Sequence, residues 1–155
     1  MIADELLRDL LAAWPVGRLA TLDEAYAPHL VPIVFCLDGE ALYSPVDGKR
    51  KRGRPLKRLQ NVAANDSCSL LLDQYDDDWR QLWWVRLDGT AEVYRPAADH
   101  EAVLRQRLLA KYPQYASVPI TGADPVFLRM RWTKVSAWAE TDLETSVIRA
   151  LAKSS

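Results

Sequence analysis

Two periods of hydrophobic spacing alternate along the chain, one typical of helices and one typical of strands. Residues 2–14 repeat their leucines every three or four positions, which places them on one helical face. Residues 16–22, 28–37 and 40–46 instead carry alternating or β-rich apolar residues between turn sequences, the pattern of strands. The first third of the chain is therefore predicted to form a helix followed by three strands.

The same spacing predicts three further strands and two or three further helices in the rest of the chain. The strands are expected at 67–74, 82–94 and 126–140, and the helices at 55–65 and 97–112. Gly89 falls inside the long strand and predicts a bulge or a bend there. The tail at 141–155 is expected to form a short helix or to fray.

Turn chemistry and element order point to a mainly β (β+α) fold. Asp38-Gly39 is a strong hairpin signal. Pro32 marks an edge strand or a bulge, because proline donates no hydrogen bond to a ladder. Helices do not alternate regularly with the strands, which argues against a doubly wound parallel sheet. With 155 residues, the chain 1–155 is expected to form one domain, a small six-stranded antiparallel barrel with peripheral helices.

The positions of the cysteines, the charges near the N-terminus and the lengths of the apolar runs indicate the cellular compartment. Cys36 and Cys68 each lie in an apolar run, so we expect two buried, reduced thiols rather than a disulfide. Charged residues interrupt the first turns, which argues against a signal peptide. No apolar run reaches the roughly 18 residues of a membrane helix. These features predict a soluble, cytoplasmic protein without a membrane partner.

Several familiar catalytic sites are missing from the sequence. With only two histidines and no CxxC or HExxH spacing, a zinc site is not expected. The sequence also has no nucleophile elbow of the GxSxG type and no glycine-rich nucleotide loop. An enzymatic activity would therefore depend on chemistry supplied by an organic cofactor.

Positive charge is concentrated at residues 49–58, where seven of ten residues are Lys or Arg in a chain of formal net charge -1. Three interpretations remain open: a solvated loop, a nucleic-acid contact through phosphates, or a site for an anionic small molecule. The third is favoured because the cations lie between a strand end and a helix start, where amides and the helix dipole attract anions. No recognisable nucleic-acid module accompanies the basic segment, so we expect no nucleic-acid partner.

Four sequence stretches together resemble one known family. They are VGRLATL (16–22), PHLVPIVFCLDGEALYSPVDGK (28–49), LKRLQNVAANDSCSLLLD (56–73) and WWVRLDGTAEV (83–93). In order and spacing they are similar to the flavin and deazaflavin split-barrel family, the pyridoxamine 5'-phosphate oxidase-like group. The similarity is closest to its coenzyme F420-dependent oxidoreductase branch. The resemblance implies a split β-barrel and a homodimer that holds its cofactor in a groove at the interface.

The resemblance also implies which residues bind the cofactor. Backbone groups of the second strand would contact the ring system, the end of the third strand would line the groove, and the basic segment would hold the phosphate. A tryptophan of the second subunit would close the groove. The matching residues are Val31, Pro32, Ile33, Tyr43, Ser44, Pro45, Val46, Lys49, Lys51, Lys57, Arg58 and Trp84. No catalytic side chain is assigned, although Tyr43, Tyr75 or His29 could donate a proton.

Charge and one departure from the family pattern refine the expected activity. An FMN phosphate needs one or two arginines, whereas the cations at 49–58 would also suit the polyglutamate tail of coenzyme F420, which is therefore favoured. The family's vitamin B6 oxidases carry an arginine-rich C-terminal motif, but here residues 131–144 turn acidic, which argues against that activity. The resemblance thus implies hydride transfer between reduced F420 and a small organic substrate. The alternatives are an FMN-dependent oxidoreductase, a flavin reductase, or a non-enzymatic protein that binds a flavin or deazaflavin.

Overall fold

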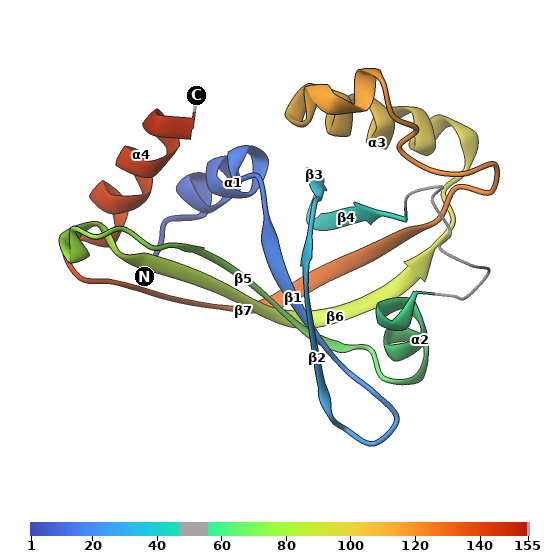
Figure 1. Ribbon diagram of the computed structural model, residues 1–155, viewed down its shortest axis with the longest axis horizontal. Coiled ribbons are helices and arrows are strands. Elements are labelled where there is room, and N and C mark those ends of the chain that lie inside the picture. The colour runs from blue at the N-terminus through green and yellow to red at the C-terminus, as the bar shows by residue number, and fades with distance from the viewer. Residues whose placement is uncertain (47–55, 155) are drawn as a thin grey trace.

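One curled antiparallel sheet organises the protein (Figure 1). The structure is a computed structural model that describes residues 1–46 and 56–154. Its strands run in the order β2-β1-β5-β6-β7-β4-β3, and all neighbouring strands are antiparallel. The strands are β1 (Gly17–Leu22), β2 (Pro28–Ile33), β3 (Cys36–Asp38), β4 (Ala41–Pro45), β5 (Ser67–Gln74), β6 (Trp83–Tyr94) and β7 (Phe127–Ala139).

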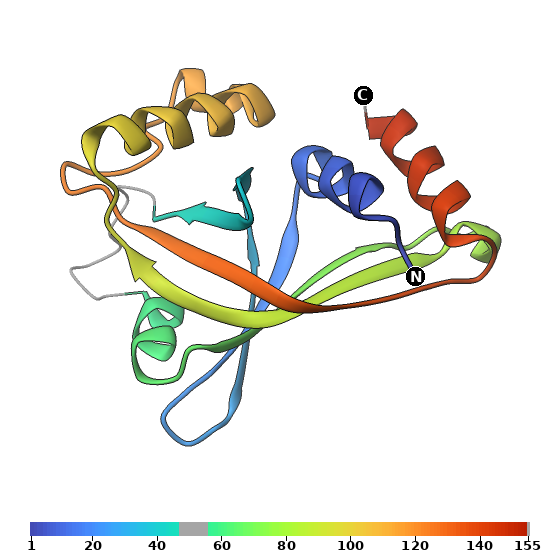
Figure 2. The same ribbon diagram turned by 180° about the vertical axis from the view of Figure 1, so that it is seen from behind.

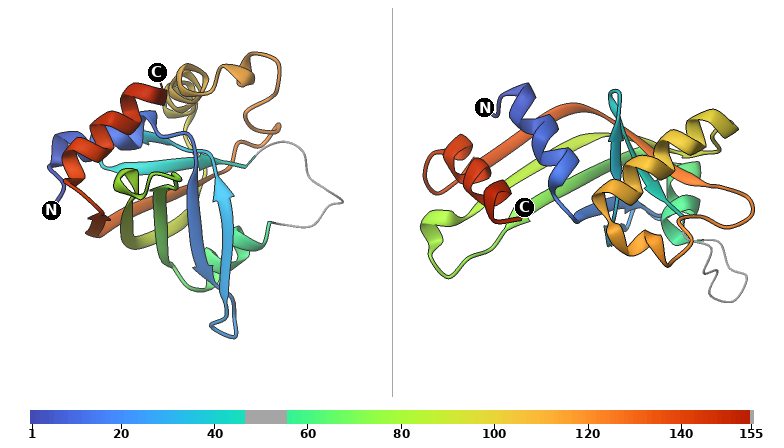
Figure 3. Two further views of the ribbon diagram at one scale, coloured as in Figure 1. Left: turned by 60° about the vertical axis from the view of Figure 1, so that its left-hand side comes forward. Right: turned by 90° about the horizontal axis from the view of Figure 1, so that it is seen from above.

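Helices cover the ends of the sheet rather than alternate with its strands (Figure 2). Helices α1 and α4 contact each other at one end, α2 packs on β6 and β1 at the other, and α3 contacts β3 (Figure 3). The helical elements are α1 (Asp4–Ala13), α2 (Lys57–Ala64), α3 (Ala98–Lys111), α4 (Leu143–Ser154) and the 3₁₀ turns η1 (Trp79–Gln81) and η2 (Pro113–Ala116). This arrangement confirms the mainly β fold with peripheral helices.

The sheet has seven strands in place of the expected six. The difference arises in the predicted strand 28–37, which the structure divides into β2 and β3. Val34 and Phe35 separate the two strands, and the Phe35 side chain is fully buried, so the chain turns there to keep this ring in the core. Strands β2 and β3 form the two ends of the strand order, and Pro32 therefore lies in an edge strand, as its missing N–H predicts.

The inner face of the curled sheet holds the main hydrophobic core. Leu19, Leu70 and Leu87, from the adjacent strands β1, β5 and β6, are fully buried there, and α1, α2 and α4 add apolar side chains to the same cluster. Trp83 is only 1% exposed, and its ring meets that of Trp14 edge-on with 4.9 Å between centroids. The inner face is therefore filled by side chains, which leaves the outer face of these strands as the surface available to partners.

A second, smaller core lies between α3 and the strands β3 and β4. Leu104 and Leu108 of α3 are fully buried against Cys36, Tyr43 and Phe127. Both cysteines of the chain are buried and free, which confirms the prediction of reduced thiols. Helix α3 therefore covers the short β3–β4 hairpin rather than the central strands.

Gly89 interrupts the longest pairing of the sheet, between β6 and β7. The register shifts between Asp88 and Gly89, and a Cβ atom at Gly89 would lie 2.0 Å from the backbone oxygen of Arg131. Only glycine permits this close backbone approach. The predicted bulge is therefore confirmed, and it lets two long strands curl around the core.

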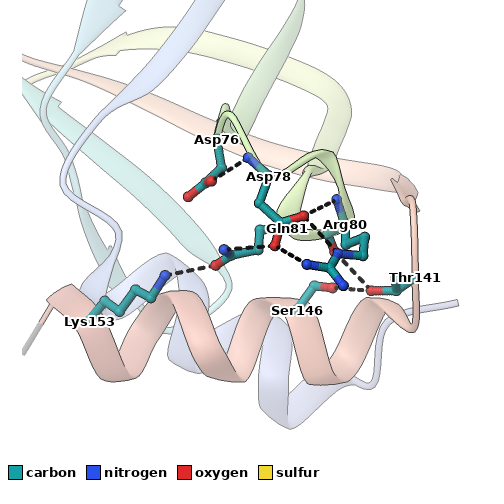
Figure 4. Close-up of polar contacts among 7 residues, drawn as sticks. All are labelled: Asp76, Asp78, Arg80, Gln81, Thr141, Ser146 and Lys153. Carbon is teal, nitrogen blue, oxygen red and sulfur yellow. Dashed lines mark hydrogen bonds and ion pairs between the residues drawn. The ribbon is translucent and has the colours of Figure 1, made fainter.

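Polar contacts fix the C-terminal helix α4 against the end of the β-sheet (Figure 4). The Lys153 ammonium donates to the Gln81 side chain at 2.7 Å, and the Thr141 hydroxyl donates to the backbone oxygen of Arg80 at 3.1 Å. Val147 on the opposite side of α4 is fully buried in the main core. The tail therefore forms an ordered helix, one of the two alternatives that the sequence left open.

Candidate functional site

A cavity of about 530 Å³ lies on the outer face of the central strands. Strand alternation builds it, because every second residue of a strand points away from the core. Arg18 of β1 is paired with Leu71 of β5, which is paired in turn with Arg86 of β6. The cavity is lined by Arg18, Ala20, Leu30, Ser69, Leu71, Asp73, Gln74, Tyr75, Leu82, Trp83, Trp84, Arg86 and Trp138.

Apolar side chains dominate the rim of this cavity. Leu30 is 65% exposed, Trp138 is 43% exposed and Tyr75 is 72% exposed. Trp84 is half-buried and lies opposite Trp138 across the β6–β7 pair. Contiguous exposed apolar surface of this kind usually marks a binding site or a subunit interface. The outer face is thus suited to being covered by a flat apolar group, a second subunit, or both.

The charges within the outer face are paired with one another. Arg18 forms an ion pair with Asp73, and the Arg86 guanidinium lies 3.0 Å from a carboxylate oxygen of Asp88. The Ser69 hydroxyl donates to Asp88 at 2.6 Å, and this bond, followed by Arg86, holds the pKa of Asp88 below its usual range. Because each arginine already has a carboxylate, these pairs add no net charge to the face, and its aromatic rim suits a planar ring.

The predicted ring-binding segment lies beside this cavity, at the edge of the sheet. Val31 is half-buried and Ile33 is buried, while Pro32 is exposed on the outer face opposite Arg18. Strand β2 pairs with β1 on one side and is an end of the strand order. Backbone groups along its other edge can therefore bind a ligand, which is the type of contact that the resemblance implies for these residues.

The predicted groove residues of β4 lie in a different environment. Tyr43, Ser44 and Pro45 are buried, and the Tyr43 ring faces α3, with its centroid 5.3 Å from that of His100. Burial raises the pKa of the Tyr43 phenol. The half-buried Val46 donates its N–H to the Val126 oxygen at 2.9 Å. The structure does not bring the Tyr43 side chain to the 530 Å³ cavity.

The predicted phosphate ligands are only partly within the described residues. Lys49 and Lys51 lie outside them. Lys57 is exposed and Arg58 is half-buried, and both belong to the first turn of α2. The residue before this helix, Leu56, provides no side-chain cap for the first N–H groups of α2. The start of α2 therefore combines two cationic side chains with amides that a helix leaves without internal partners.

Trp84, a predicted cofactor-binding residue, lines the outer cavity, and so does Tyr75, one of the three possible proton donors. Sequence reasoning did not select Arg18, Asp73, Arg86 or Trp138. Their signal was available in part, because alternation in 16–22 and 82–94 already placed arginines and tryptophans on one strand face. Alternation along a strand does not show which strands are neighbours in the sheet. The cavity depends on that strand order.

The described residues contain no group of three or more His, Cys, Asp or Glu side chains placed to hold a metal ion. Among their helices, none has both the length and the apolar character needed to cross a bilayer.

Comparison with known proteins places the fold in a family. A family model described as "Pyridoxamine 5'-phosphate oxidase" matches residues 3–139. A FAD-binding protein from Mesorhizobium loti is 24% identical, with 88% of this chain and 92% of that chain covered at TM-score 0.63. An F420 reductase is 23% identical, with 83% and 94% covered at TM-score 0.58.

Proteins with other roles share the same architecture. A haem storage protein from Vibrio cholerae is 11% identical, with 90% of this chain and 95% of that chain covered at TM-score 0.66. At identities this low, the solved structures establish a common fold. None of the curated proteins matches the sequence.

Proposed function

Because this chain belongs to the pyridoxamine 5'-phosphate oxidase family, we propose that it is an oxidoreductase that uses a flavin-type cofactor, with coenzyme F420 favoured over FMN. Two copies of the chain pack their outer sheet faces together. The cofactor lies at the border of this interface, along the free edge of β2, and Trp84 of the second copy closes the groove.

The observation that carries the proposal is the outer cavity, in which aromatic and aliphatic side chains surround two arginines that are already paired. Trp84, Trp138 and Tyr75 offer faces and edges for stacking against a planar ring. The Arg18–Asp73 pair and the Arg86–Asp88 pair keep the surface neutral. Paired charges cost less to desolvate than unpaired ones, and the rest of the rim is largely apolar, so a second subunit can cover the face and exclude water from a ring system at its edge.

The phosphate of the cofactor is assigned to the basic segment and the start of α2. The uncapped first turn of α2 offers N–H donors to an anion, and Lys57 and Arg58 add positive charge. The cations at 49–58 exceed what one phosphate needs, which favours a cofactor that continues into a chain of carboxylates. The ring and the anionic part of the ligand are thereby held by different parts of the chain.

When bound, a reduced deazaflavin supplies a hydride to an electron-poor carbon. The chain itself positions cofactor and substrate and excludes water. Tyr75 lines the cavity and is exposed, whereas the buried Tyr43 faces α3, so Tyr75 is the better placed of these two tyrosines to donate a proton. The acidic residues 140–144, where B6 oxidases carry arginines, remain an argument against oxidation of a vitamin B6 phosphate.

Cofactor titration tests this proposal and separates it from its alternatives. Apo protein is titrated with F420 and with FMN at low and at high salt, and binding is followed by cofactor fluorescence. We expect tighter binding of F420 and a loss of affinity with salt, since exposed charge pairs are screened. If the protein binds FMN and not F420, its cofactor is FMN. A bound, reduced cofactor that no electron acceptor oxidises would support the non-enzymatic binder instead.

A further inference from the structure

A second cavity, of about 280 Å³, is lined by residues of α1, β3 and α3. It is formed where the C-terminal ends of α1 and α3 approach β3. Its lining residues are Ala12, Cys36, Leu37, Arg107, Ala110 and Lys111. None of them lines the outer cavity, so this cavity is separate from the proposed cofactor groove and its role does not depend on it.

Lys111 has an unusual environment in this cavity. Its ammonium nitrogen Nζ lies 2.9 Å from the backbone oxygen of Leu11 and 3.7 Å from the ring centroid of Phe35. The Phe35 ring is fully buried. Burial lowers the pKa of Lys111 to about 7, and the nearby Cys36 opposes this shift only in part. In a large fraction of the molecules, the Lys111 amine is therefore unprotonated at neutral pH and carries a lone pair. An ordinary lysine is almost wholly protonated at that pH.

The other polar groups of the cavity are of two kinds. Arg107 is half-exposed and uses one nitrogen to contact Asp38 at 2.8 Å; its guanidinium has five N–H donors in total. The Cys36 thiol is buried, and burial raises its pKa to about 12, so it remains protonated. The lining of the cavity thus includes an amine with a lone pair, a permanent cation and apolar side chains.

A purely structural role for Lys111 would be to cap the C-terminal carbonyls of α1. The bond to Leu11 is consistent with that role. A cap is strongest when the side chain is charged, and so is the contact of Nζ with the Phe35 ring. Burial opposes both contacts and lowers the pKa of Lys111. A neutral amine still donates one N–H to the carbonyl and keeps its lone pair for reaction. The open volume beside the amine gives a small electrophile room to approach.

We propose that Lys111 is an amine nucleophile that binds small anionic aldehydes as an imine, with Arg107 holding the anionic group of the ligand. The amine lone pair forms a bond to the carbonyl carbon while the carbonyl π pair moves to oxygen, which takes up a proton. Water then leaves as the carbon–oxygen bond breaks, the C=N bond forms, and the nitrogen releases its remaining proton. No oxidant or reductant is required, and hydrolysis reverses the step.

The test uses glyoxylate as the probe, with sodium cyanoborohydride to reduce any imine to a stable amine at neutral pH. Peptide mass spectrometry then measures the labelling rate of each lysine. We expect Lys111 to be labelled at least about tenfold faster than the exposed Lys153 of α4, because burial lowers the pKa of Lys111 to about 7. Equal labelling of the two lysines would overturn the proposal.

Two sets of variants separate a reactive site from a structural contact. Lys111→Arg keeps a donor for the Leu11 carbonyl but has no nucleophilic amine, so the adduct in this cavity should vanish while the circular dichroism spectrum is retained. If Lys111→Arg fails to fold, Lys111→Met provides the same comparison. Arg107→Gln should slow labelling of Lys111 by glyoxylate severalfold but leave labelling by uncharged propanal unchanged. An equal effect on both aldehydes would overturn the anion-holding role of Arg107.

Discussion

Both cavities of this protein contain arginines paired with aspartates, but the cavity beside α3 also contains a desolvated lysine. On the outer sheet face, Arg18 and Arg86 each meet an aspartate, so they stay charged and the face is neutral as a whole. Beside α3, the polar contact of Lys111 is a backbone carbonyl and its other close neighbour is an aromatic ring. An ion pair cancels the net charge of a surface while both side chains stay ionised. Desolvation instead lowers the pKa of the lysine, so that the side chain itself loses its proton more easily.

This difference suggests different uses for the two sites. A neutral, aromatic surface binds planar groups or another copy of the chain through burial of apolar area. An amine with a lowered pKa, held next to a cavity, is suited to covalent chemistry. Variants that disturb one cavity should therefore leave the behaviour of the other unchanged.

Charge reversal of the proposed phosphate ligands should have the largest effect. With Lys49, Lys51, Lys57 and Arg58 replaced by Glu, we expect cofactor affinity to fall at least about 100-fold, because several charge-assisted contacts are lost together. Fluorescence titration with F420 and FMN measures it. The control reverses the exposed Arg149 of α4 to Glu, and should retain binding. Unchanged affinity in the first variant would show that the phosphate lies elsewhere.

Leu30→Asp tests whether a second copy covers the outer face. A charge placed in a buried apolar interface must be desolvated, so the dimer dissociation constant should rise on the order of tenfold to 100-fold. Analytical ultracentrifugation over a concentration series measures it. Ile148→Asp on α4 is the control, since Ile148 is 56% exposed outside this face. Labelling of Lys111 should be the same in both variants, and a dimer unaffected by Leu30→Asp would place the interface on another surface.

Trp84→Ala tests the aromatic contribution to cofactor binding. Loss of one stacking tryptophan should cost about 1–3 kcal/mol, or roughly tenfold to 100-fold in affinity. Trp79→Ala is the control, because Trp79 is 67% exposed on η1 and does not line the cavity. Equal losses in the two variants would indicate a general effect of removing tryptophan rather than a site at Trp84.

Lys111→Met tests the cavity beside α3 through the pH dependence of the free energy of unfolding. The pKa of Lys111 is lowered to about 7 in the folded protein from 10.5, so the unfolded chain binds more protons between these values. Stability should therefore rise as pH increases through this window, by at most about 1.4 kcal/mol per pH unit. Urea unfolding from pH 7 to 8.5 measures the slope. The Met variant should lack this part of the slope, and identical slopes would mean that Lys111 stays charged.

Arg18→Gln should have the smallest effect. The Arg18 and Asp73 side chains are 43% and 31% exposed, and exposed ion pairs contribute only about 0–1 kcal/mol to the free energy of unfolding. Urea unfolding of Arg18→Gln and of Asp73→Asn, compared with the double variant, isolates the pair. A coupling energy well above this range would show that the outer face is more desolvated than its exposure indicates.

Local sequence was sufficient for several parts of this fold. The bulge at Gly89, the hairpin at Asp38-Gly39 and the edge position of Pro32 each follow from the backbone freedom or the missing donor of one residue. Strand alternation also identified the two faces of each strand. These features depend on residues and their immediate neighbours, so they are visible without knowledge of the tertiary structure.

The candidate sites could be predicted only in part. Trp84 does line the outer cavity, but Tyr43 points toward α3, because the β3–β4 hairpin turns its second face to that helix. The pairing of Arg18 with Asp73 joins residues 55 positions apart. Such contacts depend on which strands become neighbours, which periodicity does not contain.

The sequence by itself determined the succession of helices and strands, the concentration of cations at 49–58 and the apolar character of both cysteines. The tertiary structure alone decided which side chains share a cavity and which charges are paired or desolvated. Lys111 illustrates the reason: nothing next to it in the chain distinguishes it from other lysines. Its amine is altered because α1, β3 and α3 converge there, and solvation depends on distance in space rather than on distance along the chain.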